Sequence, residues 1–213
     1  MSNLSPKNVI KIASVKEAPI YVHITYAFFI IAVVAFLMVT LGSQWALKAL
    51  LILSYLFAAV LFHELGHGFV AHCLGHKVTS VIIYPVGGLA NIQLKSPCPK
   101  DQALIAFGGP LFNFALFAIC FWFEPFAFTS LGVLSLVLGL GNMLPIRSFD
   151  GGVILRCLIT IKWNDQVAKT VVSYTTLLTV LAVCAMGIWI ESILVVLYSI
   201  FMLVYGTVMS GNE

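Results

Sequence analysis

The stretch HELGH at residues 63–67 lies inside an apolar run that extends from Trp45 to Leu74. On a helix, His63 and His67 are one turn apart and project from one face, so both imidazoles can bind one metal ion. Glu64 follows the first histidine, where its carboxylate can take a proton from a water molecule at the metal. The alternative to a metal site is that both histidines are ordinary core residues and that Glu64 is hydrogen-bonded within the core. Ionisable groups at membrane depth cost free energy unless they have partners, so the stretch indicates a functional site.

The composition is typical of a polytopic membrane protein. Of the 213 residues, 61% are hydrophobic and 9% are charged, and the mean hydropathy is +1.06. Soluble domains carry about 25% charged residues. The net charge of +3 comes from basic residues spread between apolar runs, so they indicate membrane topology and no nucleic-acid-binding face. The five cysteines are scattered, and we expect none of them to bind metal.

Hydropathy marks six apolar segments, each near the roughly 20 residues needed to cross the hydrocarbon. They are Ile24–Leu41, Trp45–Leu74, Ala103–Phe123, Phe126–Ile146, Val167–Ile190 and Ser192–Met209. We therefore expect an all-α polytopic fold of about six transmembrane helices. Residues 1–22 are expected to form a cytosolic or interfacial segment, and residues 23–213 a single integral-membrane domain.

The distribution of Lys and Arg predicts the orientation of these segments. With the N-terminus in the cytosol, ten of the eleven basic residues fall on the cytosolic side and only Lys48 falls outside. Both termini are therefore predicted to be cytosolic, and residues 156–169 are expected to form a polar cytosolic link.

Residues 77–94, between the second and third segments, predict a short β-hairpin. A run of β-branched residues ends at Tyr84, a turn contains Gly87 and Gly88, and a second short run follows. Open strand edges cannot face lipid, so the hairpin must be membrane-associated at the interface or lie beside a polar cavity. It is either a plain surface hairpin or an edge to which an extended substrate adds, with the two glycines as candidate substrate contacts.

Asn113 is a buried amide in the third apolar segment and needs hydrogen-bond partners. Hydrogen bonding between helices is the favoured role, and direct contact with a substrate is the alternative.

The fourth segment ends with Asn142 and Pro145, and Asp150 follows shortly after. Pro145 should interrupt the helix, and the broken backbone can then turn Asp150 inward. A catalytic zinc site usually has three protein ligands and one open position, so Asp150 is the candidate third ligand beside the two histidines. The alternative is an aspartate that caps a helix.

In combination, these motifs resemble the site-2 protease family of intramembrane zinc metalloproteases. The resemblance rests on the order and spacing of His63-Glu64-x-x-His67, Gly109-Pro110-x-x-Asn113 and Asn142-x-x-Pro145-x-x-x-x-Asp150-Gly-Gly. By motif it extends from about His23 to Gly152. It implies one zinc ion held by His63, His67 and Asp150, a general base at Glu64, and substrate contacts at Asn142 and Pro145.

The resemblance also implies regulated intramembrane proteolysis of single-span membrane proteins in the lipid bilayer. Many relatives append a PDZ or CBS domain, and the sequence resembles the compact form of bacteria and archaea, which places it in a prokaryotic cell membrane. Regulation by a membrane partner or a second copy of the chain stays open. The alternatives are a metal transporter or sensor that hydrolyses nothing, and an inactive relative that binds membrane proteins.

Overall fold

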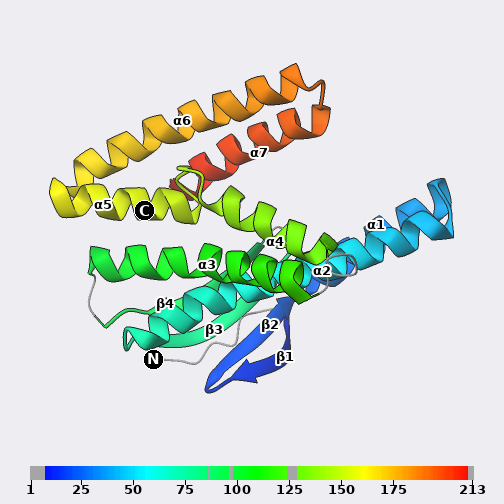
Figure 1. Ribbon diagram of the computed structural model, residues 1–213, viewed down its shortest axis with the longest axis horizontal. Helices are drawn as coiled ribbons and strands as arrows, with labels where there is room; N and C mark the ends of the chain where they lie inside the picture. The colour runs from blue at the N-terminus through cyan, green and yellow to red at the C-terminus, as the bar shows by residue number, and fades with distance from the viewer. Residues whose placement is uncertain (1–7, 86, 96–97, 124–128, 211–213) are drawn as a thin grey trace.

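The computed structural model describes residues 8–85, 87–95, 98–123 and 129–210, with the backbone alone for Thr129 and residues 203–210. Within these residues the chain forms seven helices and four strands (Figure 1). The predicted start of the fourth apolar segment, at Phe126, lies outside them.

Two helices at the centre organise the others. The helices are α1 (Ile24–Thr40), α2 (Ser43–Cys73), α3 (Pro99–Phe123), α4 (Thr129–Asn142), α5 (Asp150–Lys162), α6 (Asp165–Trp189) and α7 (Ile193–Ser210). The central pair is α2 and α3, α4 packs on both of them, and α5 packs between α3 and α6. The first half of α2 projects with α1 as one hairpin, and α6 with α7 forms a second (Figure 1).

Each of the six predicted apolar segments contains a helix, but the helices differ in length, and residues 143–146 at the end of the fourth segment are not helical. Among the described residues, α2, α3 and α6 are long and apolar enough to cross a membrane. Shorter apolar stretches of 10–17 residues are Ile24–Thr40, Ser130–Asn142 and, as far as the side chains of α7 are described, Ile193–Met202. Three candidate spans are therefore found, and the count of six stays a prediction.

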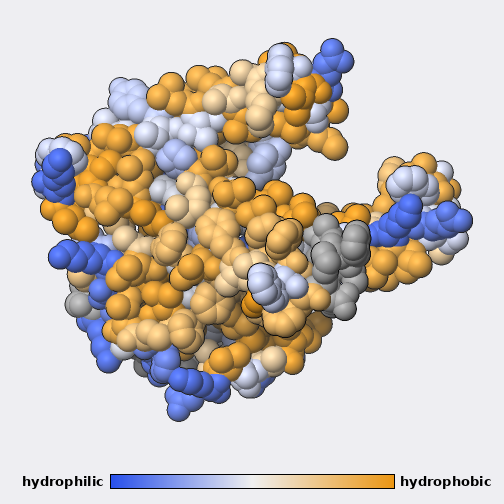
Figure 2. All heavy atoms as spheres, viewed as in Figure 1, coloured by the Kyte–Doolittle hydropathy of each residue, from blue (hydrophilic) through white to orange (hydrophobic). Residues whose placement is uncertain are grey.

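The surface of the molecule agrees with a membrane environment. Hydrophobic residues cover most of the face shown in Figure 2, and hydrophilic residues gather at its left and lower edges and at the tips of the two hairpins. Many large apolar side chains on the helices are exposed, for example Phe36, Trp122 and Leu178. In water such a surface would be costly, whereas lipid tails cover it without penalty. The chain is an integral membrane protein.

One four-stranded sheet packs against α2. Its strands are β1 (Val9–Val15), β2 (Ala18–His23), β3 (Lys77–Tyr84) and β4 (Gly87–Gln93), in the order β1-β2-β3-β4. The outer pairs are antiparallel, and β2 runs parallel to β3. The predicted hairpin at residues 77–94 is thus confirmed as β3 and β4.

The expectation of an otherwise all-α fold was wrong in the N-terminal segment, since residues 9–23 supply two more strands. The reason is long-range pairing: Ile20 lies opposite Val81, across α1 and α2 in the chain. Ile20 and Val81 are buried with Val60 of α2 in one hydrophobic cluster, so the sheet is held to the helix by core packing. The predicted boundary after residue 22 stays a prediction.

The polar link expected at residues 156–169 is largely helical, and its cytosolic position stays a prediction. Helix α5 extends to Lys162, and only two residues separate it from α6. The short length of α5 and its position between α3 and α6 make it a connecting helix rather than a span.

Close approach of α2 and α3 depends on glycine. A Cβ atom built on Gly66 would collide with the Gly108 carbonyl of α3 and would lie 2.9 Å from Phe112 Cβ. Small residues at such a crossing let two helix backbones approach, which increases their van der Waals contact.

We predict that Gly66→Ala destabilises the protein by more than about 1 kcal/mol, because overpacking pushes α2 away from α3. Gly68→Ala is the matched control, since its Cβ would meet Val78 at an ordinary 3.8 Å and alanine favours the helix. Thermal unfolding in detergent measures both. Equal midpoints for the two variants would contradict the close crossing.

Candidate active site

Three ionisable side chains from two distant elements meet beside the centre of the molecule. His63 and His67 lie in the second half of α2, and Asp150 is the first residue of α5. Asp150 Oδ2 lies 3.0 Å from His63 Nε2, and Oδ1 lies 3.5 Å from His67 Nε2. The three prospective ligand atoms lie within 4.8 Å of one another, and both histidines are buried.

The hydrogen bond on the far side of His67 sets its tautomer. His67 Nδ1 lies 2.7 Å from the Ile105 carbonyl oxygen, and a carbonyl can only accept. The Gly109 amide also points at Nδ1, at 3.3 Å. Because the contact to the Ile105 carbonyl is the shorter of the two, we assign the proton to Nδ1, which directs the Nε2 lone pair toward Asp150. A metal-binding histidine is usually oriented by such an outer hydrogen bond.

The donor set fits a zinc ion. Two imidazoles and one carboxylate are the ligand types of a three-residue catalytic zinc site. Asp150 Oδ2 is buried and makes no hydrogen bond among the described residues, although it lies 3.0 Å from His63 Nε2. A buried carboxylate oxygen without a hydrogen bond needs a compensating ion or water, and a cation held between Asp150 and the two Nε2 atoms would supply that compensation.

Glu64 lies on the same turn of α2 and faces the sheet. It is buried, with 6% of its surface exposed, and its carboxyl group lies beside the Ala90 backbone of β4. A Cβ atom on Gly88 would collide with the Glu64 side chain, at 2.7 Å from Oε1. Only glycine at this position of β4 leaves room for the carboxylate, so the strand and the candidate base are in direct contact.

The helix is interrupted before Asp150, as Pro145 predicts. Helix α4 ends at Asn142, residues 143–149 form a turn, and α5 begins at Asp150. The helix-capping alternative fails because the cap position belongs to Phe149, while the Asp150 carboxylate faces the histidines.

Two threonines of α6, which sequence reasoning missed, hold this turn. Thr175 Oγ1 donates to the Pro145 carbonyl at 3.2 Å, and Thr176 Oγ1 accepts from the Arg147 amide at 2.9 Å. Ile146 is buried against Val180 of the same helix. No motif marks the threonines, because their partners are backbone atoms about 30 positions away.

The residues expected to contact substrate lie on different elements, in α3, at the end of α4 and in β4. Asn142 lies at the end of α4 and donates to the Leu138 carbonyl at 3.0 Å. Asn113 is fully buried and joins α3 to α4. Its side-chain amide donates to the Ser135 carbonyl, and the Ser135 hydroxyl donates to the Asn113 backbone carbonyl. These are the contacts of the favoured helix-packing role. Gly87 begins β4, next to Gly88.

His23 and Cys73 lie outside the metal cluster. His23 accepts from the Thr25 amide at the start of α1 and stacks on Tyr84, with ring centroids 5.0 Å apart. Cys73 is exposed at the end of α2.

Comparison with known proteins shows which family the sequence and the fold resemble. A model of peptidase family M50 matches residues 51–129, which include the HELGH stretch. The solved structure of a site-2 protease from Methanocaldococcus jannaschii superposes with a TM-score of 0.68 and 25% identity, over 91% of each chain. Residues 51–129 of this chain thus match a peptidase family M50 domain, and the whole chain is similar to a site-2 protease.

Two curated proteins named as zinc metalloproteases are similar over much of this chain. A zinc metalloprotease of Methanocaldococcus jannaschii is 29% identical over 203 residues, which is 90% of this chain and 58% of the relative. A putative zinc metalloprotease of Synechocystis is 31% identical over 170 residues, 71% of this chain and 44% of the relative. The chain therefore spans about half of the length of these relatives.

Gly109 of α3 supplies a test of the cluster. A Cβ atom at this position would collide with the His67 ring and lie 2.7 Å from His63 Cε1. Because His67 is fixed by its hydrogen bond to Ile105, it cannot move aside cheaply. We predict that Gly109→Ala lowers the zinc bound per protein, measured by elemental analysis after dialysis.

Gly141→Ala is the control for this measurement, since a Cβ atom added there, near the end of α4, would meet nothing within 4 Å among the described residues. We expect it to retain zinc. Full zinc content in Gly109→Ala would show that the ring positions are not those of the metal site.

Proposed function

We propose that this protein is a zinc metalloendopeptidase that hydrolyses a peptide bond within or near a transmembrane segment of a membrane protein. The observation that carries the proposal is the convergence of Asp150 on His63 and His67, with Glu64 on the same helical turn. The match of residues 51–129 to the family M50 model and the likeness to a solved site-2 protease support the same activity.

Each side chain would have a distinct role. His63, His67 and Asp150 would hold one zinc ion through two nitrogens and a carboxylate oxygen. Such an ion supplies a Lewis acid for the scissile carbonyl and makes a water molecule a stronger nucleophile at neutral pH. Glu64 would take the proton of the attacking water and pass it to the leaving amine.

Strand β4 is the proposed docking edge for the substrate. It is the last strand in the sheet order, so one of its edges has no strand partner among the described residues. A transmembrane helix hides its peptide bonds in its own hydrogen bonds and must unwind before it can be cut. An unwound segment could pair with β4 by backbone hydrogen bonds beside Glu64, with Gly87 and Gly88 in contact.

Asn142 and Pro145 are proposed as further substrate contacts. They lie at the break between α4 and α5, close in the chain to Asp150. Asn113 is retained as a lesser candidate, since contact with substrate would require its buried amide to change partners.

The cellular setting is also part of the proposal. The excess of Lys and Arg on one side supports cytosolic termini in a prokaryotic cell membrane. Substrates would be single-span proteins cut in regulated intramembrane proteolysis, with regulation by a membrane partner or by a second copy of the chain.

The test is cleavage of a purified single-span substrate by the purified protein, with and without a zinc chelator. We expect Glu64→Gln to lower the rate at least about 100-fold, since it removes a general base, while zinc content stays unchanged. Glu17→Gln, in the exposed β1–β2 turn, is the control and should cleave normally.

Two results would contradict this proposal, the first in the role of Glu64 and the second in the protease activity itself. Full activity of Glu64→Gln would end the role of that residue as the base. An uncut substrate with the zinc-loaded wild type would favour a metal transporter, a sensor or an inactive binder.

A further inference from the structure

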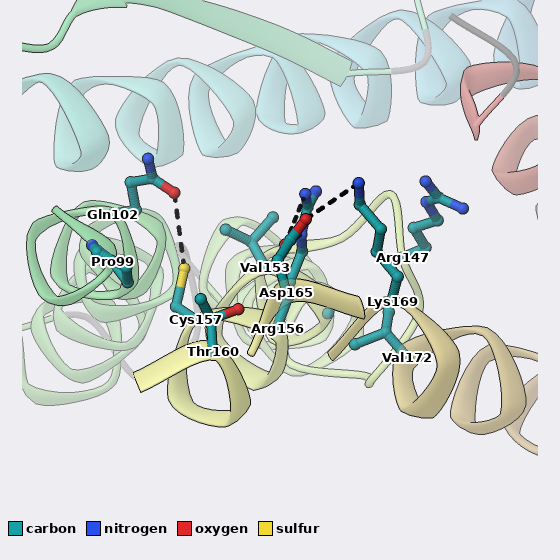
Figure 3. Close-up of a pocket in the computed structure, with 11 residues that line it drawn as sticks. Pro99, Gln102, Arg147, Val153, Arg156, Cys157, Thr160, Asp165, Lys169 and Val172 are labelled. Carbon is teal, nitrogen blue, oxygen red and sulfur yellow. Dashed lines mark hydrogen bonds and ion pairs between the residues drawn. The ribbon is translucent and has the colours of Figure 1, made fainter. Parts of the chain in front are cut away.

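The turn between α4 and α5 is not enclosed by packed side chains on every side. A cavity of about 630 Å³ borders it, lined by Arg147 of the turn, by Gly152 and Val153 of α5 and by Val172 of α6. Figure 3 shows Arg147, Lys169 and Val172 toward the same end of this cavity. The turn could therefore shift toward the cavity unless specific contacts hold it.

Hydroxyl groups of α6 supply such contacts, on two consecutive peptide groups of the turn. Thr176 Oγ1 accepts a hydrogen bond from the Arg147 amide at 2.9 Å. Thr175 Oγ1 lies 3.2 Å from the Pro145 carbonyl oxygen and 3.1 Å from the Val172 carbonyl oxygen. Because a hydroxyl has a single proton, Thr175 divides it between two carbonyls, and the contact of Thr176 is the stronger of the two.

The hydroxyl of Thr176 is oriented for this contact. Thr176 is buried, and its hydroxyl donates its proton to the Val172 carbonyl, one turn earlier in α6, at 2.7 Å. With the proton used in this way, an oxygen lone pair faces the Arg147 amide, which is the acceptor that an N–H group needs.

The position of the turn is passed directly to Asp150. The Phe149 amide donates to the Ile146 carbonyl at 2.9 Å, and Phe149 is the residue before Asp150, at the cap position of α5. The turn also lies against the first turn of α5, since a Cβ atom built on Gly152 would collide with the Ile146 carbonyl. Because these parts are in contact, a shift at Arg147 would move the start of α5 and Asp150 with it.

We propose that Thr176 is a positioning residue for the metal cluster, and that Thr175 assists it. The Thr176 hydroxyl acts through the backbone, because it holds the Arg147 amide and thereby places the Asp150 carboxylate beside the two histidines. The proposal rests on the metal site of the proposed function and extends that site to α6. Groups that orient a ligand without touching the metal have a large effect on metal affinity.

The test is the zinc affinity of the full chain in detergent, measured by competition with a zinc-binding dye. The thermal midpoint of each metal-free variant shows whether it folds. We expect Thr176→Val to bind zinc at least about tenfold more weakly than the wild type, since valine has the shape of threonine without its hydroxyl. Thr176→Ser keeps the hydroxyl and should restore most of the affinity.

Thr170→Val is the matched control on the same helix. Thr170 is exposed, and its hydroxyl donates to the Gln166 carbonyl one turn earlier, at 3.1 Å, so it bonds within α6 rather than to the turn. This variant should bind zinc like the wild type. A purely structural role of Thr176 would lower the metal-free midpoint of Thr176→Val but leave the zinc affinity of the folded protein unchanged.

Thr175→Val keeps the proposal testable if Thr176→Val does not fold, and it should weaken zinc binding by a smaller factor. The proposal is overturned if folded Thr176→Val, or Thr175→Val in its place, binds zinc like the wild type. It is also overturned if Thr176→Ser binds as weakly as Thr176→Val, or if Thr170→Val loses as much affinity. These outcomes leave the metal site intact, whereas a wild type that binds no zinc would remove the proposed metal site and this role with it.

Discussion

The approach of the Asp150 carboxylate to two imidazoles of α2 is the contact on which the rest of the structure depends. Its parts are separated by more than 80 residues of chain, and an unpaired carboxylate at this depth would be costly. The contact exists because the chain leaves its helical path at the Pro145 turn and re-enters a helix at Asp150. Helix α6 then holds the turn through Thr175 and Thr176.

Space around the cluster is as important as charge. Gly109 leaves room for the two histidine rings, and Gly88 leaves room for Glu64. Because Gly88 has no side chain, β4 contacts Glu64 directly. The strand proposed to bind the substrate therefore touches the residue proposed as the general base. The sheet is in turn held to α2 by buried residues such as Ile20 and Val60. The four-stranded sheet thus forms one wall of the candidate active site.

The sequence predicted the features that are local or carry chemistry. HELGH, the break at Pro145 and the β-branched run before Tyr84 each act over a few residues, and the structure contains the helix, the turn and the strands that they predict. Asp150 could be identified as a ligand candidate because a two-histidine motif needs a third donor.

Pairing across long stretches of chain was not predictable in the same way. The partner of Ile20 in β2 lies beyond two helices, and the partners of Thr175 and Thr176 are backbone atoms with no signature. Dispersed basic residues suggest only membrane topology when taken one by one, yet folding brings three of them to one cavity. These features arise from tertiary packing, which hydropathy and motif spacing do not encode.

The most direct test of the metal site is zinc K-edge X-ray absorption of the purified, zinc-loaded protein. Two histidines and an aspartate predict only nitrogen and oxygen neighbours, at about 2.0–2.2 Å, with imidazole scattering from two rings. A shell of sulfur at about 2.3 Å, or a single imidazole, would contradict the site.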